Sequence, residues 1–158
     1  MHASPKGFLD QPYPYHHELV LEIENVTNLG YGIARHDGWV VQVAFVLPGE
    51  RVRVRIFRNH KNYSEADCLE VLLASADRVD PKCGLFGVCG GCQYQAVRYE
   101  TQLLWKRQQV EESFSRIGGL EIPVEPVEPS PKTFGYRSKL TPHYGRARDS
   151  EKRKVGFL

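Results

Sequence analysis

The sequence predicts a mainly β protein with one long helix (α+β), in which a five-stranded OB-like antiparallel barrel precedes a small, incomplete α/β region. Short runs of alternating apolar and polar residues recur between positions 17 and 73, with turn residues between them. A single stretch, Tyr99 to Ile117, has helical periodicity. We therefore divide the chain into a flexible lead-in (1–15), a barrel domain (16–76) and a region with a cysteine cluster and the helix (77–158).

Size and composition favour a folded protein made of two small modules. The chain has 158 residues, 41% of them hydrophobic, and its aromatic residues are spread along the whole length. No apolar run approaches the roughly 18 residues that a membrane span needs. Residues 1–10 show no basic segment followed by an apolar one, as a secretory signal would. We expect a soluble, cytoplasmic monomer without a membrane partner.

The barrel prediction depends on short strands that follow one another without an intervening helical pattern. Residues 1–15 contain three prolines and no periodicity, so we expect a mobile lead-in. Strands are expected at residues 19–23, 38–47, 51–56 and 63–73, with a break at Gly30-Tyr31-Gly32. Such closely spaced strands are typical of small barrels that bind oligonucleotides, although a fold alone does not establish a function.

A basic stripe on one predicted strand is a candidate nucleic-acid contact. In Arg51-Val52-Arg53-Val54-Arg55-Ile56, the period of two places three arginines on one face. They lie about 6.8 Å apart, close to the phosphate spacing along a single strand of nucleic acid. The alternative is an exposed strand kept soluble by charge. The candidate nucleic-acid-binding residues of this stripe are Arg51, Arg53, Arg55, Arg58 and Lys61.

The most specific motif is the Cys-x5-Cys-x2-Cys run formed by Cys83, Cys89 and Cys92, with glycines between the thiols. Three close cysteines in a chain of cytosolic type indicate metal ligands more than disulfides or free thiols. Zinc sites normally show a second ligand pair, whereas three clustered cysteines and a remote fourth are the commoner layout for an iron-sulfur cluster. Within the chain only Cys68 could be the fourth, and a small buried core residue is its more favoured role.

The region after the cysteines is predicted to hold a helix and a further basic strand. The apolar residues of 99–117 fall on one helix face, and Gly118-Gly119 supplies a left-handed C-cap. Four prolines then indicate an extended linker, and residues 136–144 are expected to be a strand with Arg137 and Lys139 on one face as further nucleic-acid contacts. The end, residues 154–158, is expected to be a strand that stops in mid-course, which suggests a truncated polypeptide.

Catalytic motifs are missing from the sequence. It has no glycine-rich dinucleotide or phosphate loop and no Ser/His/Asp set, and its histidines lack ligand spacing. We therefore expect no catalytic residues in this chain.

Taken together, the motifs resemble the N-terminal part of the bacterial-type 5-methyluridine RNA methyltransferases. The resemblance rests on residues 30–35 and 47–52 of a TRAM domain, on the three cysteines followed by Gln93-Tyr94-Gln95, and on Tyr136-Arg137-Ser138-Lys139. It implies that the three cysteines join a fourth, from outside this chain, to hold a four-iron four-sulfur cluster. It also implies that the barrel binds ribosomal or transfer RNA.

The same resemblance implies a chemistry that this chain does not carry. In the family, a C-terminal domain binds S-adenosylmethionine, a cysteine adds to the uracil ring, and a carboxylate removes the ring proton after methyl transfer. Those groups would lie beyond Leu158, so we expect this chain alone neither to bind the donor nor to methylate RNA. The alternative is a stand-alone RNA-binding module in which Cys68 or a histidine completes a structural zinc site.

Overall fold

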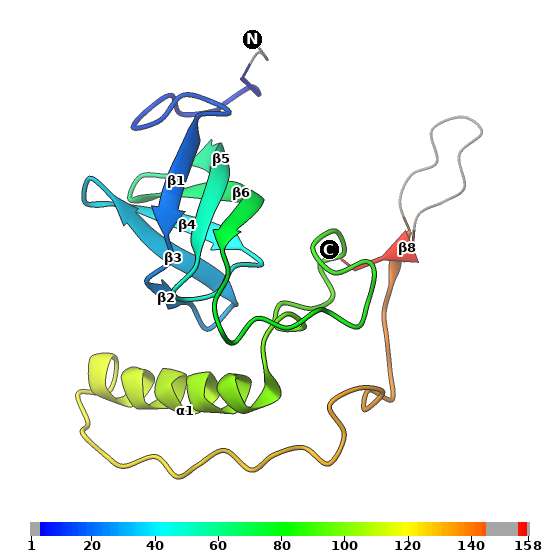
Figure 1. The fold of residues 1–158 in the computed structure, drawn as a ribbon. Coiled ribbons are helices and arrows are strands. Elements are labelled where there is room, and N and C mark those ends of the chain that lie inside the picture. The colour runs from blue at the N-terminus through cyan, green and yellow to red at the C-terminus, as the bar shows by residue number, and fades with distance from the viewer. Residues whose placement is uncertain (1–3, 145–154, 158) are drawn as a thin grey trace. The chain divides into compact units, whose positions relative to one another are not determined.

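The structure is a computed structural model that describes residues 4–144 and 155–157. The chain forms two compact units, Met1–Arg78 and Val79–Leu158. The first holds a β-sheet and the second a long helix (Figure 1). The mainly β fold with one helix agrees with the prediction.

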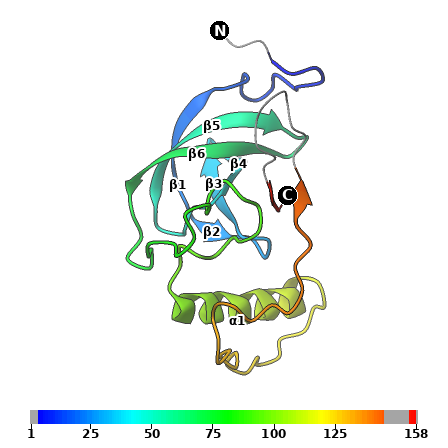
Figure 2. The same cartoon turned by 90° about the vertical axis from the view of Figure 1, so that its right-hand side faces the viewer.

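The first unit is a six-stranded sheet that curls around its own apolar face (Figures 1 and 2). The strand order is β1-β5-β6-β4-β3-β2. The strands are β1 (Glu18–Glu22), β2 (Asn25–Val26), β3 (Tyr31–His36), β4 (Trp39–Ala44), β5 (Arg51–Asn59) and β6 (Tyr63–Leu73).

Two details of the predicted barrel are wrong. The sheet has six strands instead of five, because the two-residue β2 pairs with β3 at Asn25↔Ile33 and Val26↔Gly32. The sheet is also not wholly antiparallel, since β4 and β6 run parallel from Val40↔Tyr63 to Val43↔Ala66. An alternating pattern identifies a strand but contains no information about the direction of its neighbours.

The expected break at Gly30-Tyr31-Gly32 is confirmed only at Gly30, which lies in the turn before β3 with φ +84°, because β3 already begins at Tyr31. Gly32 is a buried strand residue paired with Val26 and Val43. A Cβ atom there would collide with the Val46 side chain and would lie 3.0 Å from Cγ2 of Ile23. The glycine therefore allows a close approach within the sheet interior.

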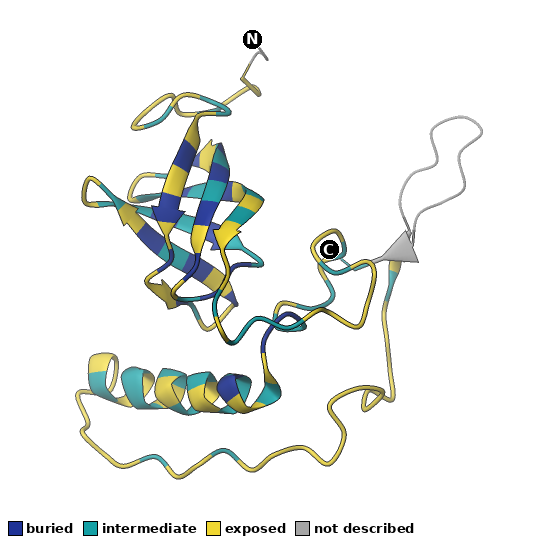
Figure 3. Cartoon of the chain, viewed as in Figure 1, coloured by how far each residue is buried: buried dark blue, intermediate teal, exposed yellow. Residues whose placement is uncertain are grey.

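The core lies inside the curl of the sheet, and Figure 3 shows the buried positions alternating along the strands. Strand β5 illustrates the pattern, since Val52, Val54 and Ile56 are all fully buried between more exposed arginines. Residues before the sheet also contribute, because Phe8 and Tyr13 pack against this core. The prediction of a flexible lead-in did not anticipate these contacts.

A buried ion pair closes the first unit. Glu50, in the turn between β4 and β5, has no exposed surface, and its carboxylate forms an ion pair with Arg78. The same carboxylate accepts hydrogen bonds from the backbone N–H groups of Leu47 (2.8 Å) and Ser75 (3.2 Å). Arg78 Nη2 also donates to the Phe45 carbonyl at 3.0 Å. The turn and the end of the unit are thus held together by one satisfied charge pair.

The second unit is built on helix α1 (Tyr99–Arg116). The helix ends where predicted, and Gly119 adopts the expected left-handed conformation (φ +63°). The predicted apolar face is largely uncovered, since Ile117 is 86% and Val110 43% exposed. Helix α1, the only helix in the part of the chain described, does not combine the length and the apolar character that crossing a membrane requires.

The strand predicted at residues 136–144 is much shorter than expected. Only β7 (His143–Tyr144) is a strand, and it pairs with β8 (Val155–Gly156). Residues 136–142 have no partner strand among the described residues, and an unpaired segment forms no ladder. The rest of the expected final strand, Lys154 and Leu158, lies outside the described residues.

Candidate nucleic-acid surface and cysteine loop

The basic stripe on β5 is largely paired with carboxylates from its neighbouring strands. Arg53 contacts Glu18 of β1 (2.9 Å) and Glu70 of β6 (3.2 Å). Arg55 lies 3.2 Å from Asp67. These carboxylates raise the pKa of Arg53, chiefly through the hydrogen bond to Glu18. Any phosphate that binds Arg53 or Arg55 must compete with an existing ion pair.

The remaining cations of the stripe differ in how free they are. Arg58 is exposed and lies 3.8 Å from the partly buried Glu65, which makes a loose pair. Neither Arg51 nor Lys61 has a carboxylate within 4.0 Å in the described part of the chain, and both are exposed. The basic residues of the stripe therefore differ in whether a carboxylate already neutralises them. Arg51 and Lys61, which have no such partner, are the residues best able to contact a phosphate.

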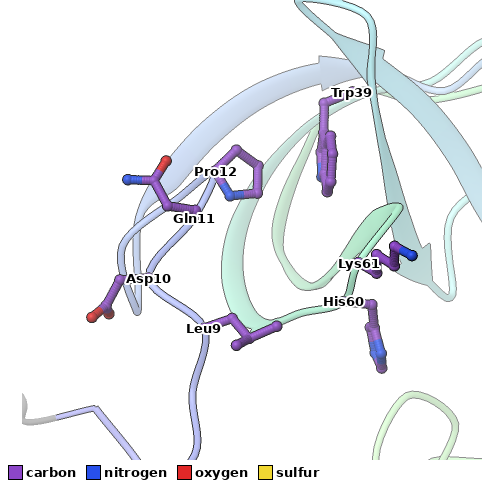
Figure 4. A pocket seen from close by; sticks show the side chains of 7 residues that line it. All are labelled: Leu9, Asp10, Gln11, Pro12, Trp39, His60 and Lys61. Carbon is purple, nitrogen blue, oxygen red and sulfur yellow. The ribbon is translucent and has the colours of Figure 1, made fainter.

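An open pocket of about 380 Å³ lies beside Lys61, at one end of the sheet (Figure 4). Its lining comes partly from the lead-in and partly from the sheet. The lining residues are Leu9, Asp10, Gln11, Pro12, Trp39, His60 and Lys61.

A buried polar network holds the two walls of this pocket together. The Asn59 side-chain amide donates to the carbonyls of Leu9 and Tyr13, each at 2.6 Å. Asn59 accepts a hydrogen bond from the Ser64 hydroxyl (2.6 Å), which in turn accepts from the Trp39 indole N–H (2.9 Å). Because every polar atom in this chain of contacts has a partner, the walls are fixed before any ligand arrives.

The three predicted metal ligands all belong to the loop that precedes α1. Cys83 is exposed, whereas Cys89 and Cys92 are half-buried. The Gln95 side chain joins the two ends of this loop, because its Oε1 accepts from the Cys83 backbone N–H (3.1 Å) and its Nε2 donates to Cys92 Sγ (3.1 Å). Sequence reasoning noted Gln95 only as part of a motif.

Backbone groups also favour the thiolate form of Cys89. Hydrogen bonds from the backbone of Phe157, and then of Gly91, lower the pKa of the Cys89 thiol. Among the described residues, no three Cys, His, Asp or Glu side chains are close enough together to hold a metal ion. The donor chemistry of the loop, three sulfurs with N–H donors directed at two of them, nevertheless suits a thiolate-bound metal.

Cys68 belongs to a different part of the protein. It lies on β6 and packs against the core of the first unit, and burial raises the pKa of its thiol. This arrangement matches the core role favoured by the sequence and not a ligand role.

Arg137 and Lys139 are exposed and lie outside any strand, so the shared strand face expected for them is absent. The Arg137 guanidinium instead lies 5.9 Å from the centre of the Tyr136 ring. Arg146 and Arg148, which follow in the sequence, lie outside the described residues.

Comparisons with known proteins give matches to a family model, to curated relatives and to a solved structure. A family model described as the TRAM domain matches residues 18–69. An uncharacterized RNA methyltransferase from Thermotoga maritima is 39% identical over 140 residues, which cover 87% of this chain and 32% of the relative. Another, from Nitratidesulfovibrio vulgaris, is 44% identical over 112 residues, covering 70% of this chain and 24% of the relative.

One solved structure is also similar in part. The crystal structure of Pyrococcus abyssi tRNA (uracil-54, C5)-methyltransferase with S-adenosyl-L-homocysteine is 30% identical. The match covers 74% of this chain and 25% of that one, with a TM-score of 0.47. The chain spans about a third or less of the length of the relatives it matches.

Proposed function

On the premise that this chain carries a TRAM domain and is similar to RNA methyltransferases, we propose that it is the RNA-binding and metal-binding portion of an RNA uracil-5 methyltransferase. The observation that carries the proposal is the similarity to an RNA methyltransferase over 87% of the chain. The substrate would be ribosomal or transfer RNA, in the cytoplasm. The uracil-5 specificity rests on the resemblance of the motifs, above all the cysteine run with Gln95.

RNA binding would use the cations that are not already paired. We expect Arg51→Gln to lower the slope of log affinity against log salt for RNA by about 0.7 to 0.9, as the loss of one phosphate contact does. Arg53→Gln is the matched control, because Arg53 is already paired with Glu18 and Glu70. The salt slope of Arg53→Gln should therefore change less than that of Arg51→Gln.

Fluorescence anisotropy with transfer RNA and with a ribosomal RNA fragment, between 50 and 300 mM salt, measures both slopes. No binding to either RNA by the unaltered chain would contradict the proposed function. Equal slopes for both variants would show instead that the carboxylates do not limit the arginines.

The cysteine loop would hold an iron-sulfur cluster through Cys83, Cys89 and Cys92, with a fourth ligand from outside this chain. Bound there, such a cluster supplies either electron transfer or a structural crosslink. This chain's own contribution is to favour thiolates: Gln95 fixes Cys83 relative to Cys92, and backbone N–H groups point at Cys89.

Anaerobic reconstitution tests this assignment. We expect a brown, oxygen-sensitive species with less than one cluster per chain, because three thiolates leave one iron without a protein ligand. Cys83→Ser should remove the colour, whereas Cys68→Ser, in the core, should leave it. Tight stoichiometric zinc without colour would favour the stand-alone RNA-binding module with a structural zinc site.

The methyl donor and the reacting groups would belong to parts of the enzyme outside this chain. We expect the 158-residue chain alone neither to bind S-adenosylmethionine nor to methylate RNA, since no residue in it is assigned to either task. Titration calorimetry with the donor and a methyl-transfer assay on bulk RNA measure this. Saturable donor binding at micromolar affinity would contradict it.

A further inference from the structure

We propose that the pocket between the lead-in and the sheet binds one unpaired, stacked nucleobase of single-stranded RNA, with Lys61 contacting the adjacent phosphate. The inference rests on the proposed RNA-binding function and goes beyond it by naming the site and the form of RNA. The pocket lies partly outside the TRAM match, because Leu9 and Pro12 precede residue 18.

The walls of the pocket suit a flat aromatic ligand. Figure 4 shows Leu9 and Pro12 on one side of the pocket and Trp39 on the other, while the polar ends of Asp10 and Gln11 point away from it. A nucleobase fits a volume of about 380 Å³, and stacking on an aromatic ring is the usual way in which proteins hold single-stranded bases.

The aromatic wall is fixed in place before binding. The Trp39 indole N–H is committed to Ser64, and Trp39 also packs against the core. Asn59 holds the opposite wall through the carbonyls of Leu9 and Tyr13. Because little side-chain freedom remains to be lost, binding at this site costs less ordering entropy than binding at a mobile surface.

Charge at the rim favours a nucleotide over an uncharged ring. Lys61 is exposed and has no carboxylate partner among the residues that the structure describes. Next to it, His60 stacks on Tyr63 with ring centres 4.3 Å apart. Its Nε2 lies 3.1 Å from Glu65 but forms no hydrogen bond in the described structure, so His60 carries no free charge toward the rim comparable to that of Lys61. The free ammonium is therefore the group that would meet a phosphate, as in other single-strand sites.

Recognition at this pocket should depend on the presence of a base and little on its identity. No side-chain amide or carboxylate of the lining points into the pocket to read hydrogen-bonding edges (Figure 4). Stacking tolerates every base because each has a flat face. The pocket is therefore a site for holding an unpaired base, not for reading a sequence.

Tryptophan fluorescence offers a direct test, because the chain has two tryptophans and Trp105→Phe leaves Trp39 alone. In that background we expect a decauridylate to quench Trp39 in a saturable way. A ten-residue abasic oligonucleotide of the same charge should bind at least about fivefold more weakly, as the loss of one stacked base predicts, and should quench little. Decaadenylate should behave like decauridylate.

Variants separate the two contacts. Trp39→Leu should weaken decauridylate binding about fivefold or more while leaving the affinity for the abasic oligonucleotide unchanged. Lys61→Gln should lower the salt slope by about 0.7 for both, whereas Lys106→Gln, on α1, is the control expected to have no such effect. Since Lys61 is exposed, its variant stays informative if Trp39→Leu fails to fold.

The outcomes of these experiments separate the assignment of the pocket from the proposed RNA-binding function. RNA binding without Trp39 quenching, or with equal affinity for the abasic oligonucleotide, would overturn the pocket assignment and leave RNA binding in place. Quenching by an acidic peptide but not by decauridylate would also overturn it, in favour of a protein partner. No binding to any RNA would overturn the proposed function itself.

Discussion

Replacing Arg78 by methionine should destabilise the first unit far more than the loss of an ordinary surface charge. Glu50 has no exposed surface, and its Arg78 partner is 24% exposed. Arg78→Met removes both contacts to the carboxylate and the bond to the Phe45 carbonyl. The carboxylate would keep only the two backbone N–H groups of Leu47 and Ser75.

The expected loss in the free energy of unfolding follows from the burial of the Glu50–Arg78 ion pair. Removing one partner of a buried ion pair costs about 3–5 kcal/mol, because a buried charge is left uncompensated. A small domain has a total free energy of unfolding of roughly 5–15 kcal/mol, so a large part of the stability would disappear. The melting temperature should fall by about 12 °C or more at the usual 4–8 °C per kcal/mol for a unit of this size.

Urea unfolding monitored by Trp39 in the Trp105→Phe background measures this loss. Arg53→Met is the matched control, because Arg53 also contacts carboxylates but its side chain is 40% exposed. Such an exposed pair contributes little to stability, because water screens it. A loss below 1 kcal/mol for Arg78→Met, or equal losses for the two variants, would refute the reasoning that Glu50 depends on Arg78.

Three further outcomes follow from packing and charge. Gly32→Ala should lower the free energy of unfolding of the first unit by about 1–3 kcal/mol, because the added methyl group overpacks the core. Gly84→Ala is the control, since a Cβ there meets nothing within 4 Å, and equal urea midpoints for the two variants would contradict the prediction. Burial alone would raise the pKa of Glu50, because it disfavours the charged carboxylate. The hydrogen bonds from Arg78, Leu47 and Ser75 outweigh this effect, so the pKa of Glu50 is lowered. The unfolded state therefore binds more protons, and stability present at neutral pH should be lost as pH falls below about 4.3; Glu50→Gln should lack that dependence in urea titrations at pH 7, 5 and 3.5. Ile117 is 86% exposed, so Ile117→Ser should change the free energy of unfolding of the second unit by less than about 0.5 kcal/mol. Thermal unfolding of the chain measures this change, and a large loss would mean that the helix face is covered.

The sequence was enough to predict the helix, the strands and the motifs that depend only on residues close together in the chain. Helix α1 follows from the spacing of Leu103, Val110 and Phe114 and from the glycines that end it. Strand β5 follows from its strict alternation. The predicted resemblance to RNA methyltransferases is confirmed by the relatives, because the cysteine run and the TRAM residues are each contiguous in sequence.

The features that the sequence did not reveal depend on register between distant segments. Alternation placed Arg53 on an outer face but could not show that Glu18 and Glu70 would lie beside it. The pocket likewise needs Asn59 to reach back to Leu9 across 50 positions. Such pairings are set by the whole sheet and leave no local signal.

The buried Glu50 has a consequence for the order of events on the ribosome. Its partner Arg78 follows 28 positions later, beyond the TRAM match at 18–69 and beyond the boundary predicted at 76. Strand β6 ends at Leu73, so at about 5–20 residues per second the guanidinium that neutralises the carboxylate is translated roughly 0.25 to 1 second after the last strand of the sheet. Until then the nascent sheet would have to bury a lone charge to close, so the wait favours an open sheet. We therefore expect the first unit to close only once Arg78 is available to Glu50.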